Sequence, residues 1–246
     1  MAMIAPFMPG DVVAQMVYAG QAAPPGIGVN GLAQIEKLAV VDDNTCCDKI
    51  KQAVCPLCTT CCCPRRYKVT DVAKGYNVGN TLYNITETSC CCPNQWTLTD
   101  LTFQQVHVYS RKCCTFFPFS ICFGGPGFDV HEMINGGKGA HQGSAQVPFC
   151  QCCDSGYDIR SPYDTNLYFV GTVCHCCEKG MDFHPVWNDD KTEVLKMNVH
   201  VRPCLKKYLP CFCCCMDDYW IVDFPTQAIP SERSQFIAGT LLKEAL

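Results

Sequence analysis

Short runs that alternate between apolar and polar residues recur from residue 67 onward, and Gly, Asn and Pro separate them. These runs are rich in Val, Thr, Tyr and Phe, and alternation over so few residues predicts β-strands with one buried face. They cover residues 67–72, 81–89, 96–103, 106–111 and 128–133. The main body of the chain is therefore predicted to be mainly β.

The second half of the chain repeats motifs of the first half in the same order, at an offset of about 90 residues. Tyr67-Lys-Val is echoed by Tyr157-Asp-Ile, and Phe128-Asp-Val is echoed by Trp220-Ile-Val. Two copies are too few for a solenoid, whereas a closed barrel of two halves removes every sheet edge. We predict a closed antiparallel barrel with pseudo-symmetric halves over residues 67–148 and 149–224.

The pattern changes after Pro230, where a helix is expected over residues 231–246. Ser231 is a suitable N-cap, and apolar residues recur at helical spacing on one face. A helix of this length is too short to span a bilayer unaided. Its predicted core face consists of Ile237, Ala238, Leu241, Leu242 and Ala245.

The N-terminal part of the chain precedes this predicted barrel. Residues 1–30 are rich in Ala, Gly, Pro and Met, and we interpret them as an extended arm or a partner-binding tail. Residues 31–66 are expected to form a lead-in helix and a cysteine-rich loop, because the segment from Gly31 to Val41 has apolar residues at helical spacing.

Cysteine is the compositional outlier, with 24 in 246 residues. The first residues, MAMIAPFMPGD, lack the basic segment of a secretory signal. Many of the cysteines are consecutive, and neighbouring cysteines rarely form a disulfide with each other because the geometry is strained. We therefore expect an intracellular, reducing location, at the cytoplasmic face of a membrane or within a cytoplasmic assembly.

The densest cysteine cluster is compatible with three fates: metal binding, acylation, or unmodified structural thiols. A CxxC pair beside further thiols suits tetrahedral zinc. The triplet before Pro64-Arg65-Arg66 also suits acylation, since basic residues would face an anionic lipid surface. The candidate zinc ligands are Cys46, Cys47, Cys55, Cys58, Cys61, Cys62 and Cys63, and the candidate lipidation sites are Cys61, Cys62, Cys63, Cys213, Cys214 and Cys215.

Other functional classes find little support. The net charge of −4 argues against nucleic-acid binding through bulk positive charge. The glycine-rich stretches at 124–128 and 136–140 lack the spacing of a phosphate-binding loop and are expected to be turns. His107, His131 and His200 lie in alternating runs and are expected to be wall residues. We find no hydrolytic or redox site.

Several ordered motifs resemble the phospholipid scramblases, which share the tubby-like barrel. They include Tyr67-Lys-Val-Thr-Asp, Gly127-Phe-Asp-Val-His-Glu-Met, Val173-Cys-His-Cys-Cys and Asp218-Tyr-Trp-Ile-Val-Asp-Phe-Pro before an apolar helix. The resemblance covers about nine-tenths of the chain. It implies about twelve antiparallel strands around a central C-terminal helix, so the apolar face of that helix would be core.

Two departures from the family pattern bear on function. The family's proposed Ca²⁺ segment carries several carboxylates around Phe-Pro, but here only Asp218 and Asp223 precede Phe224-Pro225. Ca²⁺ requires six to eight oxygen ligands, so Ca²⁺ is not expected as a cofactor. The C-terminal helix also lacks the long apolar tail that has been interpreted as membrane-spanning.

Two functional hypotheses follow from these observations. The first is a scramblase-like, lipid-associated protein at a phospholipid membrane surface, without Ca²⁺ activation. The second is a structural component of a large protein assembly that uses the same barrel as a scaffold. Metal buffering by the thiols is a third, weaker idea.

Overall fold

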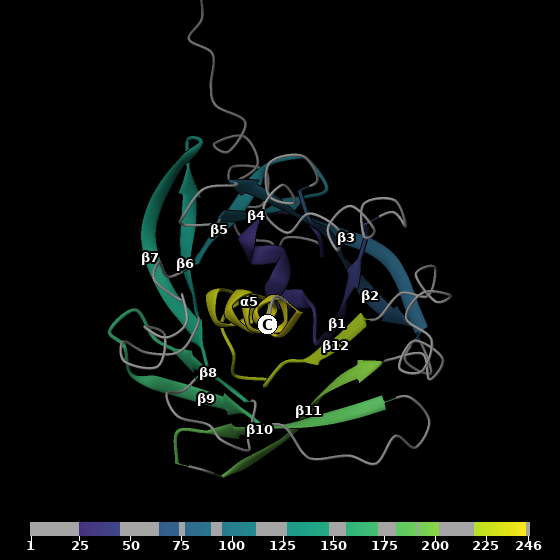
Figure 1. Ribbon diagram of the computed structural model, residues 1–246, viewed down its shortest axis with the longest axis vertical. Helices are drawn as coiled ribbons and strands as arrows, with labels where there is room; N and C mark the ends of the chain where they lie inside the picture. Colours follow the sequence, from purple (N-terminus) through teal and green to yellow (C-terminus); the bar gives the residue numbers. More distant parts are fainter. Residues whose placement is uncertain are drawn as a thin grey trace, which may run out of the picture.

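The computed structural model describes residues 25–44, 64–73, 77–89, 95–111, 127–147, 156–171, 181–190, 192–201 and 219–244. Figure 1 shows a ring of strands around the C-terminal helix, with a short helical segment of the N-terminal region beside it. The lead-in is a short 3-10 helix, η1 (Val29–Gln34), and the chain ends with helix α5 (Pro230–Glu244). The strands are β1 (Lys37–Asp42), β2 (Arg66–Ala73), β3 (Asn77–Ser89), β4 (Gln95–Asp100), β5 (Gln105–Arg111), β6 (Gly127–Ile134), β7 (Gly137–Gln146), β8 (Tyr157–Arg160), β9 (Asn166–Val170), β10 (Met181–Asn188), β11 (Glu193–Val201) and β12 (Tyr219–Asp223).

The twelve strands form a closed antiparallel barrel in which each strand pairs with its neighbours in the sequence. The barrel closes between β1 and β12, with Ala39 opposite Ile221. The prediction of a mainly β fold with a closed barrel and a C-terminal helix is confirmed. The barrel also includes β1, which lies in the range 31–66 that was expected to form a lead-in helix and a loop.

The β6–β7 hairpin departs from the turn expected at residues 136–140. The turn is limited to Asn135 and Gly136, both with positive φ (51° and 75°), which is the two-residue geometry that suits a tight hairpin. Gly137 to Ala140 already belong to β7. This glycine-rich stretch is therefore a strand, because pairing with β6 outweighs its weak intrinsic β-propensity.

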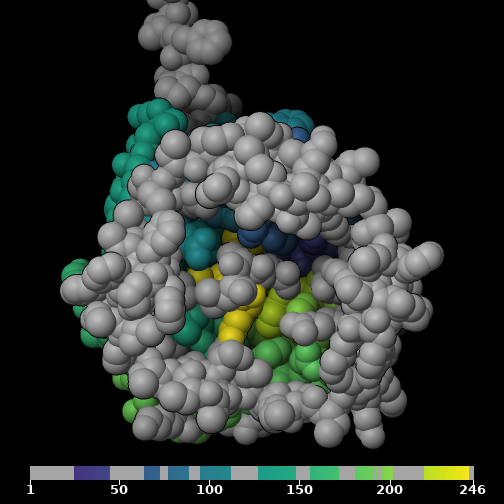
Figure 2. Space-filling view, viewed as in Figure 1, coloured from purple at the N-terminus to yellow at the C-terminus, as the bar shows by residue number. Residues whose placement is uncertain are grey.

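Helix α5 fills the barrel. Every residue from Arg233 to Leu242 is buried, polar residues included. Ser234 Oγ lies 2.9 Å from the hydroxyl of Tyr109 on β5, and Gln235 donates to the carbonyl of Gln142 at 2.7 Å. The wall thus provides hydrogen-bond partners for Ser234 and for the side-chain amide NH₂ of Gln235, as burial in an apolar interior requires. In Figure 2 the molecule is hollowed at its centre, and α5 is visible there in yellow.

The helix begins one residue before the predicted Ser231 N-cap. Pro230 is the first helical residue, a position at which proline loses no helical hydrogen bond. The carboxylate of Glu232 accepts a hydrogen bond from the Ile229 amide at 3.1 Å, which satisfies a donor at the helix start.

The two ends of the barrel differ in what the chain places there. The odd-numbered strands finish at one end, which we call the thiol end because the cysteine-containing intervals of the sequence follow these strands. The even-numbered strands finish at the other, which we call the turn end. Because β12 finishes at the turn end, α5 enters the barrel from there, and η1 packs beside its first turn.

Among the described residues, none of the helices is long and hydrophobic enough to cross a bilayer.

Candidate functional site

All 24 cysteines lie outside the described residues, but their sequence positions relate simply to the barrel. They fall only in the intervals between an odd-numbered strand and the even-numbered strand that follows it. In an antiparallel up-and-down barrel, those intervals begin and end at one end of the barrel. By interval, they are Cys46, Cys47, Cys55, Cys58, Cys61, Cys62 and Cys63 (β1–β2); Cys90, Cys91 and Cys92 (β3–β4); Cys113, Cys114 and Cys122 (β5–β6); Cys150, Cys152 and Cys153 (β7–β8); Cys174, Cys176 and Cys177 (β9–β10); and Cys204, Cys211, Cys213, Cys214 and Cys215 (β11–β12).

The two candidate lipidation triplets belong to neighbouring intervals. Cys61 to Cys63 precede β2, and Cys213 to Cys215 precede β12. Since β12 pairs with β1 and β1 pairs with β2, the strand ends that flank both intervals are adjacent around the barrel. Closure of the barrel therefore makes the strands that flank the two triplets neighbours, although the triplets are about 150 residues apart in the sequence.

The predicted zinc ligands, Cys46 to Cys63, also lie outside the described residues. Within the described part of the chain, no three His, Cys, Asp or Glu side chains come together as a group that would hold a metal ion. The prediction of a zinc site therefore stays a prediction.

The predicted core residues of α5 are found where they were expected. Ile237, Ala238, Leu241 and Leu242 are buried, whereas Ala245 lies outside the described residues.

Asp223, considered with Asp218 for Ca²⁺, is engaged by cations of the chain itself. The Lys37 and Lys196 ammonium groups both lie 3.1 Å from its carboxylate. Asp218 is outside the described residues. Two ammonium groups on one carboxylate compete with any metal for its oxygens.

Exposed apolar side chains concentrate at the turn end. Phe103 and Tyr163, at the tips of the β4–β5 and β8–β9 connections, are 84% and 90% exposed. Exposed Asp164 and Asp189 accompany them at the same end. The exposed apolar set at this end comprises Val78, Leu101, Phe103, Ile134, Tyr163 and Ile229, which we call the crown.

Gly26 and Gly28, in the described part of the N-terminal arm, lie at the turn end. The Gly28 amide donates to the Asp100 carboxylate at 2.8 Å, and the Leu101 amide donates to the Gly26 carbonyl at 3.0 Å. Asp100 additionally accepts from Thr102 and Gln104, so one carboxylate ties the β4–β5 turn to the start of the described chain.

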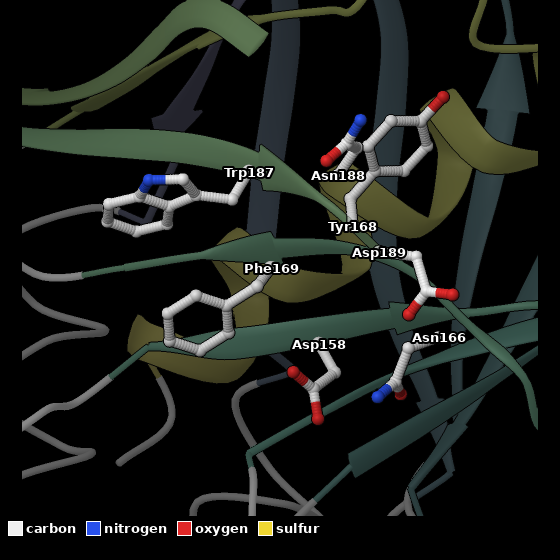
Figure 3. Close-up of a pocket in the computed structure, with 7 residues that line it drawn as sticks. All are labelled: Asp158, Asn166, Tyr168, Phe169, Trp187, Asn188 and Asp189. Atoms are coloured by element: carbon white, nitrogen blue, oxygen red, sulfur yellow. The ribbon is translucent and has the colours of Figure 1, made fainter. Parts of the chain in front are cut away.

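A cavity of about 430 Å³ lies where β8, β9 and β10 adjoin, toward the turn end (Figure 3). Asp158, Phe169 and Trp187 are register partners across these three strands. Their chain neighbours Ile159, Val170 and Val186 pack in the barrel core, so this row faces outward. The described lining residues are Asp158, Asn166, Tyr168, Phe169, Trp187, Asn188 and Asp189.

The aromatic rings of the cavity depend on two glycines. The rings of Phe169 and Trp187 stack with centroids 5.5 Å apart. A Cβ at Gly171 would lie 2.2 Å from Trp187 Cζ3, and one at Gly156 would lie 2.6 Å from Phe169 Cζ. The glycines thus let both rings lie against the backbone of the wall.

Negative charge predominates around the cavity. Asp158 lies 3.3 Å from the guanidinium of Arg160, which also contacts Asp164 at 3.0 Å. Asp189 is exposed at the rim. Burial raises the pKa of Asp158, partly offset by Arg160. Among the described lining residues, none is basic.

The barrel interior holds buried histidines rather than an exposed catalytic pair. His107 is buried, and burial lowers its pKa to about 4. His200 stacks on Trp220 with ring centroids 4.2 Å apart, and His184 lies on Trp220 at 4.8 Å. His107 and His200 are thus wall residues, as expected.

Sequence reasoning did not identify the cavity. Its residues come from three strands, and their relation depends on register, which periodicity alone does not give. The one available signal was the pairing of aromatic residues with Asn and Asp in two separate runs, 166–169 and 187–190.

Comparisons with protein-family models, curated proteins and solved structures found no match.

Proposed function

We propose that this chain is a scramblase-like, lipid-associated protein that attaches to a phospholipid membrane through its thiol end. The observation that supports the proposal is the confinement of all 24 cysteines to the intervals at one end of the barrel. One acyl chain binds a membrane weakly, whereas two or more anchors together bind it firmly. Triplets in adjacent intervals at one end would act on the same membrane surface.

The distribution of charge supports this orientation. Arg66 is exposed at the start of β2, three residues after Cys63, and Arg65 precedes it. Exposed Asp164 and Asp189 lie at the opposite end. An anionic leaflet attracts the first set and repels the second. Asp43 is also exposed at the thiol end, beside Lys68, and Lys138 is exposed at the turn end. The proposed function does not use Ca²⁺, in keeping with the two lysines on Asp223.

The test is thioester mapping of the full chain expressed in cells that acylate proteins. Hydroxylamine-dependent mass tagging should show several acyl groups, and fractionation should place the protein with membranes. Replacing Cys61, Cys62 and Cys63 with Ser should remove part of the adducts, and replacing Cys213, Cys214 and Cys215 as well should release the protein. The matched control replaces Cys150, Cys152 and Cys153, which are equally numerous and belong to the β7–β8 interval.

Two results would overturn acyl attachment. One is the absence of any hydroxylamine-sensitive adduct, and the other is an unchanged membrane fraction in the double-triplet variant. Near-stoichiometric zinc without adducts would assign the β1–β2 cysteines to a metal site instead. A lipid-flip assay in vesicles should show the same rate with and without Ca²⁺.

The crown supports a second candidate, a structural component of a protein assembly. Phe103 and Tyr163 each expose most of a large aromatic side chain, on two separate connections at this end of the barrel. The neighbouring Asp164 and Asp189 disfavour an anionic membrane there, so a protein partner fits this end better. Gly26 and Gly28 of the arm lie at the same end, so the arm would add to the contact.

This second candidate predicts a different set of sensitive residues. Phe103→Ser and Tyr163→Ser together should shift the protein from large particles to small ones in sedimentation of native extracts. Thr165→Ala, an exposed polar change in the same turn as Tyr163, is the control. Unchanged sedimentation of the crown variant would reject the candidate.

A further inference from the structure

The cavity between β8, β9 and β10 combines aromatic surface with unbalanced negative charge. Phe169 and Trp187 supply two stacked rings, and Asp158 and Asp189 supply two carboxylates. In Figure 3 the two rings project to one side, and Asp158, Asn166 and Asp189 line the other. The site therefore has an apolar half and a polar half.

This combination discriminates among ligand classes. A phosphate or other anion would face the carboxylates of Asp158 and Asp189 with no basic group among the described lining residues. A Ca²⁺ ion would need more oxygen ligands than two carboxylates supply and gains little from the apolar rings. An organic cation satisfies both halves, since aromatic faces attract cations and carboxylates balance their charge.

The ion pairs beside the cavity do not neutralise all of its carboxylates, so negative charge remains for a cationic ligand. Arg160 contacts both Asp158 and Asp164, so one guanidinium is shared by two carboxylates. Asp189 adds a further negative charge at the exposed rim. The local field thus favours a cation even with Arg160 in place.

The aromatic half narrows the choice of cation. A primary ammonium is strongly hydrated and loses that hydration beside the rings of Phe169 and Trp187. A methylated ammonium presents apolar methyl groups while keeping its charge, and aromatic sites recognise this group. The polar atoms of Asn166 and Asn188 would contact a hydroxyl or ester group attached to it.

We propose that this cavity binds a quaternary ammonium group of the choline class. The group could come from a free small molecule or from a phospholipid headgroup. Asn166, Asn188 and Asp189 of the lining lie toward the turn end, whereas Gly156 and Gly171 beneath the rings border two of the cysteine intervals. Ligand binding and acylation are therefore measured separately.

The experiment titrates the full chain with choline chloride by calorimetry, against NaCl at equal ionic strength. The neutral analogue 3,3-dimethylbutanol, in which a carbon replaces the nitrogen, tests whether charge is needed. We expect saturable binding of choline, with the neutral analogue about tenfold weaker. Equal binding of both compounds, or no saturable choline binding, would overturn the proposal.

The variants locate the site without relying on a disruptive change. Asp189→Asn removes an exposed charge and should weaken choline binding severalfold. Trp187→Ala should abolish it, and Trp187→Phe should restore part of it because an aromatic ring remains. Tyr163→Ala, an exposed aromatic change outside the described lining, is the control and should bind choline as the parent does. Unchanged affinity in Asp189→Asn and Trp187→Phe together would contradict the assignment.

Further binding experiments distinguish the two possible sources of the quaternary ammonium group. Phosphocholine in solution and vesicles of phosphatidylcholine test the headgroup, and vesicles of phosphatidylglycerol serve as the lipid without the cation. If choline binds and phosphatidylcholine vesicles do not, the natural ligand is a free small molecule. Preference for a trimethyl-lysine peptide over choline would reject the small-ligand proposal. Failure in all arms leaves the acylation test unaffected, so the two proposals stand or fall separately.

Discussion

Arg233 on helix α5 donates a hydrogen bond of 2.6 Å from Nη1 to the carbonyl of Ile35, almost 200 residues earlier in the chain. The same atom lies 2.9 Å from the Leu32 carbonyl and 3.1 Å from that of Ala33, and Nε donates to Ala228 at 2.8 Å. Arg233 is 6% exposed. One guanidinium thus joins the internal helix to the lead-in that closes the turn end.

Replacing Arg233 with Met should lower the free energy of unfolding by about 3 kcal/mol, because buried carbonyls lose their donors. Arg233→Lys should restore little, since an ammonium cannot reproduce the planar fork of donors. Denaturant unfolding measures both. Arg66→Met, at an exposed position, is the control. Equal stability of Arg233→Met and the parent would show that the hydrogen bonds of Arg233 contribute nothing to stability.

The sequence predicted the strands best where β-branched and aromatic residues alternate. The run at 106–111 became β5 (Gln105–Arg111), and the run at 128–133 became β6 (Gly127–Ile134). The glycine-rich β7 was not predicted, because most of its residues have weak β-propensity and only its neighbours in the barrel hold it extended. Pairing with neighbouring strands, and not local propensity, therefore makes this segment a strand.

The helix shows a second limit of sequence reasoning. Its predicted apolar face, including Ile237 and Leu241, is buried as expected. Ser234, Gln235 and Thr240 are buried too, although periodicity assigns polar residues to a solvent face. Their burial depends on hydrogen bonds such as that between Ser234 and Tyr109. Such partners, like the register behind the cavity, cannot be derived from one segment alone.

Gly239 marks a close approach of the helix to the wall. A Cβ at this position would lie 2.1 Å from Cε2 of Tyr157 on β8. Gly239→Ala should therefore destabilise the protein by about 1–3 kcal/mol through overpacking, despite the better helix propensity of alanine. Thermal unfolding tests this against Gly137→Ala, where the nearest atom would be 3.5 Å away. Greater stability of Gly239→Ala than of the parent would show that the helix can shift.

Asp100 is predicted to hold the start of the described chain against the barrel. Its carboxylate accepts hydrogen bonds from the amides of Gly28, Thr102 and Gln104. Asp100→Ala removes these acceptors and should destabilise the fold by about 1–3 kcal/mol. Amide exchange at Gly28 and Leu101 should accelerate. Asp164→Ala removes a carboxylate that is 73% exposed and should leave both exchange rates unchanged. Slow exchange at Gly28 in Asp100→Ala would rule out this role.

His107 should make stability fall as the solution becomes acidic. Burial lowers its pKa to about 4, whereas an unfolded chain has an ordinary histidine pKa near 6.5. Between these values the unfolded state binds the proton and the folded state does not, so the free energy of unfolding rises with pH across this window. The contribution is fully present above about pH 6.5 and amounts to roughly 3 kcal/mol at most. His107→Gln should flatten the change in stability between pH 4 and 6.5. His141→Gln removes a half-exposed imidazole and serves as the control. Denaturant unfolding at each pH gives the two profiles, and an equally steep profile in His107→Gln would show that other groups cause the acid sensitivity.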